Sequence, residues 1–81
     1  MTNAEYKALG TSAGKRAALA HSEMAAARAW FEHVGDRADA SPGGRHLFEA
    51  AYELSYTLVV RSELKQRVPS YHLALAFLLG A

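Results

Sequence analysis

The chain has 81 residues, of which 51% are hydrophobic, and a formal net charge of +1 from 9 basic and 8 acidic side chains. It contains no cysteine, which excludes disulfide bonds and thiolate zinc sites as sources of stability. The balanced charge argues against a chain whose main partner is a nucleic-acid backbone. We expect one domain, 1–81, with a core so small that a second copy or a partner would add burial.

The stretch from Asn3 to Val34 carries the clearest helical pattern. Thr2 and Glu5 fit a capping box, which predicts a helix start near Asn3, and Gly35 predicts its end. Small and apolar residues recur at alternating spacings of four and three, the repeat that a partner helix requires. This alanine seam consists of Ala13, Ala17, Ala20, Met24, Ala27, Phe31 and Val34. Alanine is also the best helix former, so chance is the alternative explanation.

Two glycines leave open whether this stretch forms one helix or two. Gly10 and Gly14 weaken a helix by up to ~1 kcal/mol each relative to alanine. Either one helix runs over 3–34 with a weak point at 10–14, or a short helix precedes a main helix that begins near Ser12. We favour the second, because Ser12 can act as an N-cap.

Residues 36–44 form a linker, and a second helix is predicted over 42–67. Ser41 and Pro42 suit its N-cap and first position, and basic residues suit its last turn. Its main apolar stripe is Leu47, Ala51, Leu54 and Leu58, broadened by Phe48, Tyr52, Tyr56 and Val59. A helix that is apolar on most sides is expected to lie between neighbours.

A third helix is predicted over 70–79, after Pro69 breaks the pattern. Residues 71–79 carry no formal charge, so we expect them to be buried against the other helices or in another chain. The predicted fold is therefore all-α: a long helical hairpin with a short apolar C-terminal third helix, completed as a homodimeric helical bundle.

The sequence holds no convincing catalytic, metal or cofactor site. The stretch from Gly10 to Arg16 resembles a P-loop, but it is one residue short and has Arg16 where a hydroxyl is needed. His46 and Glu49 could share a helical face, yet a di-metal bundle needs such a pair repeated. Ser70 and His72 lack a nucleophile elbow. We predict no enzyme, no cofactor and no metal.

The favoured function is non-catalytic protein binding by a small helical regulator, inhibitor or adaptor that occludes a surface of a larger protein. Antitoxins, anti-activators and phage-encoded inhibitors resemble it in size and class only. Aromatic anchors dominate interfaces, so the candidate interface residues are mostly aromatic, with two from the seam. They are Trp30, Tyr52, Tyr56, Tyr71, Phe77, Met24 and Ala27. For Phe31 and Phe77 we favour a place in the core, and for Trp30 an interface.

The alternative function is nucleic-acid binding by a small helical dimer. Two basic clusters support it: Lys7, Lys15 and Arg16, and then Arg61, Lys65 and Arg67. Arg45, at the start of the second helix, could add an anion contact, although we favour a flexible hinge with a conventional helix cap as the explanation of that segment. The expected partners are a second copy and a larger protein, with no membrane.

The expected location is the cytoplasm. The first residues lack the apolar run of a signal peptide, and no stretch of about 18 apolar residues is present.

Overall fold

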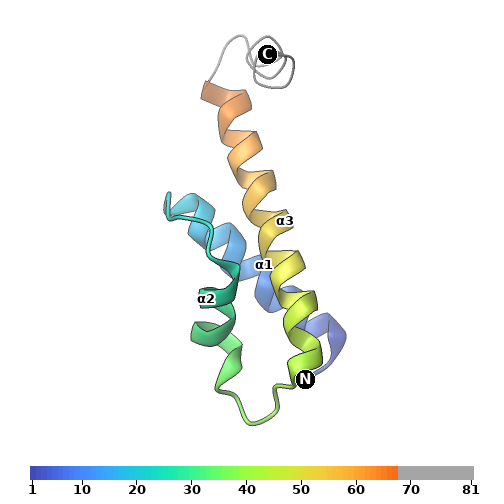
Figure 1. The fold of residues 1–81 in the computed structure, drawn as a ribbon. Helices are drawn as coiled ribbons and strands as arrows, with labels where there is room; N and C mark the ends of the chain where they lie inside the picture. The colour runs from blue at the N-terminus through green and yellow to red at the C-terminus, as the bar shows by residue number, and fades with distance from the viewer. Residues whose placement is uncertain (68–81) are drawn as a thin grey trace, which may run out of the picture.

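A computed structural model describes residues 1–67 of the chain, and its regular elements are all helical (Figure 1). In chain order they are α1 (Asn3–Leu19), α2 (Ala26–Trp30), the π-helical turn η1 (Phe31–Gly35) and α3 (Pro42–Arg67). The all-α prediction is confirmed for this part of the chain. The helix predicted over 70–79 lies outside the described residues.

Local chemistry sets the start of α1. The Thr2 hydroxyl accepts from the Glu5 amide at 3.2 Å, and the Glu5 carboxylate accepts from the Thr2 amide at 3.1 Å. This is the predicted capping box. Hydrogen bonds that the Thr2 amide and the Thr2 hydroxyl donate to the Glu5 carboxylate hold the pKa of this carboxyl below its usual value.

Both alternatives for 3–34 are wrong: no helix begins near Ser12, as we favoured, and no single helix reaches Val34. Gly10 and Gly14 do not interrupt α1, which instead ends at Leu19 before an irregular segment leads to α2. His21 adopts a left-handed conformation with φ 57°. Its amide donates to the Ala18 carbonyl, and the Ser22 amide donates to the Ala17 carbonyl. Together these bonds form a Schellman motif, in which histidine takes the place that glycine usually has.

The glycines of α1 are contact points. A Cβ at Gly10 would overlap the Phe48 carbonyl oxygen, and one at Gly14 would overlap the Tyr52 carbonyl oxygen and the Ser55 hydroxyl. The backbones of α1 and α3 therefore approach more closely than side chains would permit. The two glycines stand one turn apart, which aligns them on the face of α1 that meets α3.

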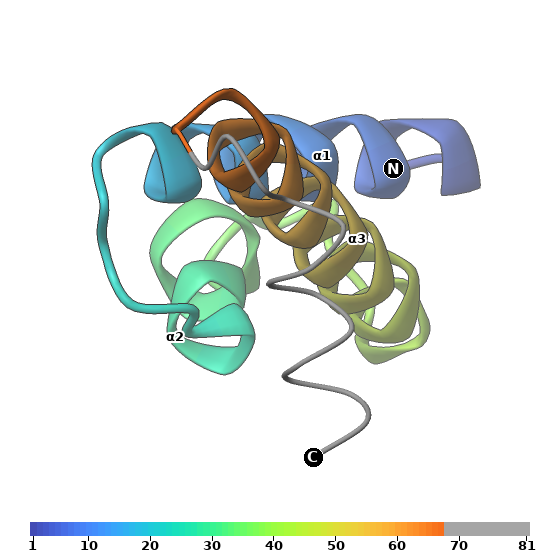
Figure 2. The ribbon, with the colours of Figure 1, turned by 90° about the horizontal axis from the view of Figure 1, so that it is seen from above.

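The helices pack in an up-down-up arrangement. Tyr6 of α1 covers Gly44, Gly10 meets Phe48 and Gly14 meets Tyr52, so α1 and α3 run in the same direction. The expected packing of the first helix against the long one is present. After α1, the chain runs back through α2 and η1 to the start of α3 (Figure 1). Seen from above, α2 and α3 lie on the same side of α1 (Figure 2).

A row of aromatic rings joins the three helices. Ring centroids are 6.0 Å apart from Tyr6 to Trp30, 5.6 Å from Trp30 to Phe48 and 6.4 Å from Phe48 to Tyr52. Tyr56 extends the row at 6.2 Å from Tyr52. Phe48 and Val34 are the largest fully buried side chains among the described residues. Such aromatic pairs add about 0.5–1.5 kcal/mol each beyond their area burial.

The tyrosines of this row also hold the loops. The Tyr52 hydroxyl accepts from the Ala25 amide at 3.2 Å, and the Tyr56 hydroxyl donates to the Ser22 carbonyl. At the other end, the Tyr6 hydroxyl accepts from the Ser41 amide at 2.7 Å. Both connections around α2 are therefore fixed by phenol groups from the packed helices.

The face of α3 that enters the core is not its predicted apolar stripe. Phe48, Tyr52 and Ser55 are buried, whereas Leu54 and Leu58 are exposed. The buried residues follow the line of contact with α1, where ring and backbone atoms fit against glycine. The expectation that α3 is sandwiched on most sides is not met by residues 1–67.

Candidate protein-binding surface

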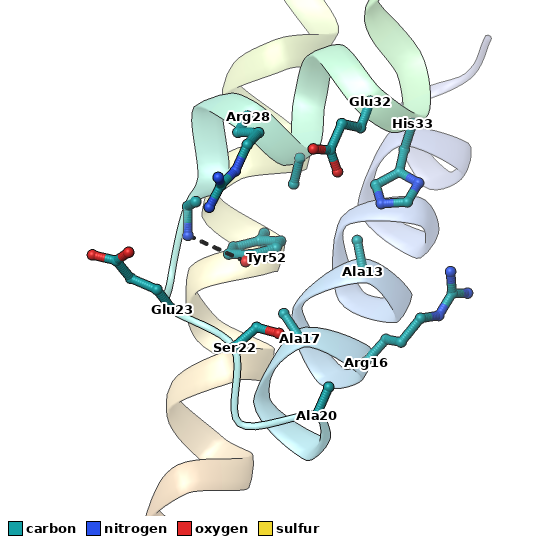
Figure 3. Close-up of a pocket in the computed structure, with 12 residues that line it drawn as sticks. Ala13, Arg16, Ala17, Ala20, Ser22, Glu23, Arg28, Glu32, His33 and Tyr52 are labelled. Atoms are coloured by element: carbon teal, nitrogen blue, oxygen red, sulfur yellow. Dashed lines mark hydrogen bonds between the residues drawn. The ribbon is translucent and has the colours of Figure 1, made fainter.

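A cavity of about 370 Å³ opens between α1 and the chain from Ser22 to His33, which includes α2 and the first part of η1 (Figure 3). Alanine methyl groups from both elements form much of its wall, and Tyr52 of α3 lines it as well. Ala13, Ala17 and Ala20 are the first three members of the predicted alanine seam. The seam therefore contributes to a wall of this cavity, and its remaining members lie beyond the chain reversal.

The chemistry around this cavity is mixed. Arg16, Glu23, Arg28, Glu32 and His33 stand around it, and all five are exposed to solvent (Figure 3). Both signs of charge are present, so the edge does not select an anion or a cation. Its alanine side chains offer shape to a ligand but no polar group, and the hydroxyl of the buried Tyr52 already accepts a hydrogen bond from the Ala25 amide.

Residues 1–67 show no side-chain group typical of metal binding. The described part of the chain has no group of three His, Asp or Glu side chains placed to hold a metal ion. Glu49, which might have paired with His46, accepts a hydrogen bond from Arg45 instead. The Arg45 guanidinium also lies 5.0 Å from the centroid of the Phe31 ring. Arg45, the predicted anion contact, is therefore already engaged by Glu49 and Phe31.

The most distinctive surface runs along α3 beside its contact with α1, where Leu47 packs against the core and Ala51 lies next to Gly10. Leu47, Ala51, Leu54 and Leu58 follow one another at spacings of four, three and four, and we call them the leucine stripe. Leu47 and Ala51 are half-buried, while Leu54 is 62% and Leu58 is 54% exposed. A seam with this repeat suits a partner helix, and within residues 1–67 its last two leucines remain in water.

The repeat continues past the leucines with a change of chemistry. Arg61 and Lys65 follow Leu58 at spacings of three and four, and both are exposed. Among the side chains that the structure describes, ion pairs join Arg37 to Asp39 and Arg45 to Glu49, and His21 lies 3.4 Å from Glu63. The seam is therefore apolar in the first part of α3 and cationic toward its C-terminal end, which stands above α1 and α2 in Figure 1.

Other exposed apolar side chains are more scattered. Leu19 is 56%, Met24 is 43%, Phe31 is 56% and Leu64 is 45% exposed. They come from the end of α1, the loop, η1 and the far part of α3. Single exposed apolar residues are ordinary in proteins and need no partner.

The predicted interface residues separate into three groups. Trp30 is 5% and Tyr52 is 3% exposed, so both are core residues in this structure, and Trp30 does not lie at the interface we expected. Tyr56 is half-buried, whereas Met24 and Ala27 are exposed. Tyr71 and Phe77 lie outside the described residues. The expected place of Phe31 in the core is also wrong, because its ring is exposed beneath Arg45.

The predicted basic residues lie on two helices. Lys7, Lys15 and Arg16 are exposed along α1, and Arg61 and Lys65 are exposed along α3, which ends at Arg67. The sequence pattern placed Leu54 and Leu58 on the main apolar stripe of a helix expected to lie between neighbours, and it did not predict their exposure. The signal that could have found them is the pair of cations at the next two seam positions, because a core seam seldom continues into charge.

Comparison with models of known protein families, with curated proteins and with solved structures finds no match to this chain. The proposed function therefore rests on the surface of the described residues. Within residues 1–67, no helix combines the length and the apolar character that crossing a bilayer requires.

Proposed function

We propose that the chain is a non-catalytic protein-binding module, a small regulator, inhibitor or adaptor that occludes a surface of a larger protein. The observation that supports the proposal is the exposure of Leu54 and Leu58 on a seam with the spacing of helix–helix contacts. Apolar side chains in such a row are typical of surfaces that receive an amphipathic helix. We place this activity in the cytoplasm, as the sequence predicts.

Nucleic-acid binding ranks second. The exposed cations of α1 and α3 favour it, but Arg61 and Lys65 continue a row of leucines. Phosphate contacts do not need such a row. If this alternative holds, the chain should give a salt-sensitive mobility shift that disappears in the variant with Arg61→Glu and Lys65→Glu.

The test of protein binding replaces both exposed leucines, Leu54→Glu and Leu58→Glu, in one variant. Surface substitutions of this kind change stability by about 0.5 kcal/mol or less, so the circular dichroism spectrum should stay unchanged. Leu19→Glu is the matched control, because Leu19 is similarly exposed but lies off the stripe. Affinity capture with quantitative mass spectrometry should recover one set of proteins with the native chain and the control, and lose it with the double variant.

Identical capture by all three proteins would remove the leucine stripe from the proposal. The predicted homodimer is measured separately by light scattering over a range of concentrations. A dimer that the double variant abolishes would assign the stripe to self-association and not to a larger protein.

A further inference from the structure

We infer that the leucine stripe receives an amphipathic helix of another protein, and that this helix carries acidic residues where it meets Arg61 and Lys65. The inference rests on the proposed protein-binding function and names the chemistry of the partner. It follows from the order of residues along one seam: four apolar positions, then two exposed cations.

A partner helix that follows the whole seam meets both parts of it. Its apolar residues would cover Leu54 and Leu58, and its next one or two turns would lie beside the cations. Glutamate or aspartate there would pair with Arg61 and Lys65, whereas lysine or arginine would be repelled. The seam thus discriminates between partner helices by the charge that follows their apolar residues.

A second copy of this chain fits the seam less well. In a parallel pair of α3 helices, Arg61 and Lys65 would each face their own equivalents. In an antiparallel pair that sets Leu54 against Leu58, Arg61 would face Ala51 and Lys65 would face Leu47. Neither arrangement supplies a carboxylate, so each leaves the cations repelled or set against apolar groups.

A membrane surface also fits less well. Helices that lie in a bilayer interface present a broad apolar face flanked by cations. Here Glu53 and Thr57 are exposed on α3 within the same turns as Leu54 and Leu58, and the stripe is only as wide as a helix–helix seam. The narrow apolar row favours a helix as its occupant.

The test uses labelled synthetic helices and the full chain. Two acidic peptides carry four leucine seam positions with a pair of glutamates either before or after them, so that both orientations are covered. Two basic twins carry lysine in place of glutamate. Fluorescence anisotropy at low salt should show the better acidic peptide binding on the order of tenfold more tightly than its twin, with the difference shrinking at high salt.

The decisive variant is Arg61→Glu with Lys65→Glu, in which the preference should reverse so that the basic peptide binds more tightly. Leu54→Glu should abolish binding of all four peptides, which tests the proposed function separately. Equal affinities for acidic and basic peptides would overturn the inference and leave protein binding intact. Failure of every peptide to bind would overturn it too, with light scattering or anionic vesicles then showing whether a second copy or a lipid surface takes the stripe.

Discussion

Two neighbouring faces of α3 show opposite relations between hydrophobicity and burial. One face meets α1 at Gly10 and Gly14, and it buries Phe48 and Tyr52. The adjoining face carries leucines with regular spacing, and Leu54 and Leu58 remain exposed. What separates them is shape, because glycine lets a neighbouring helix approach so closely that aromatic rings fill the space on either side. The core follows the close contact and not the most hydrophobic row.

The largest expected difference in stability is between the truncation of a buried side chain of α3 and the truncation of an exposed one. Phe48→Ala should lower the free energy of unfolding by about 3–5 kcal/mol, because Phe48 is fully buried and its loss leaves a cavity. Leu58→Ala should change it by about 0.5 kcal/mol or less. Denaturant titrations followed by circular dichroism measure both. Equal losses would mean that Leu58 is as much a core residue as Phe48, and that the leucine stripe is not an exposed surface.

A pair of glycine substitutions tests the close contact directly. Gly14→Ala should lower stability by about 1–3 kcal/mol, because the new methyl group would overlap the Tyr52 carbonyl and the Ser55 hydroxyl. Gly43→Ala is the control, since nothing lies within 4 Å of its added Cβ. There the stability should rise by a few tenths of a kcal/mol and by no more than ~1 kcal/mol. A stable Gly14→Ala variant with an unchanged thermal midpoint would contradict the α1–α3 contact.

The smallest effect is expected at the chain reversal. His21→Gly should raise stability by about 0.5–1 kcal/mol, because glycine adopts the left-handed conformation without the Cβ penalty. The contact of His21 with Glu63 at 3.4 Å is exposed and offsets little of this gain. His21→Val should instead lower stability by about 1 kcal/mol or more. If valine is tolerated as well as glycine, α1 does not end at this left-handed residue.

Several boundaries were predictable because each depends on a local chemical signature. The Thr2–Glu5 capping box gave the start of α1, and the Ser41–Pro42 pair gave the start of α3. Gly35 is the last residue of η1, but none of the described glycines has a positive φ, so this end does not use the left-handed conformation expected there. At the two helix starts the predicting residues lie at the boundary itself.

The chain reversal and the choice of core face were not predictable in this way. No glycine or proline marks the end of α1, because His21 takes the left-handed position and alanines continue on both sides of it. The roles of Gly10 and Gly14 depend on carbonyl groups of α3 more than thirty residues away. The exposure of Leu54 and Leu58 follows from the same distant contact, and so the candidate surface could not be read from the pattern alone.

The same-direction packing of α1 and α3 also has a consequence for synthesis on the ribosome. Tyr6 and Ser41, which share a hydrogen bond, lie 35 residues apart in the chain. At roughly 5–20 residues per second, about 2–7 s separate the emergence of the two. During that interval the face of α1 that holds Gly10 and Gly14 lacks its partner, and a short helix with two glycines is marginal in water. We therefore expect α1 to become stable only when the first turns of α3 have been made and can cover its glycines.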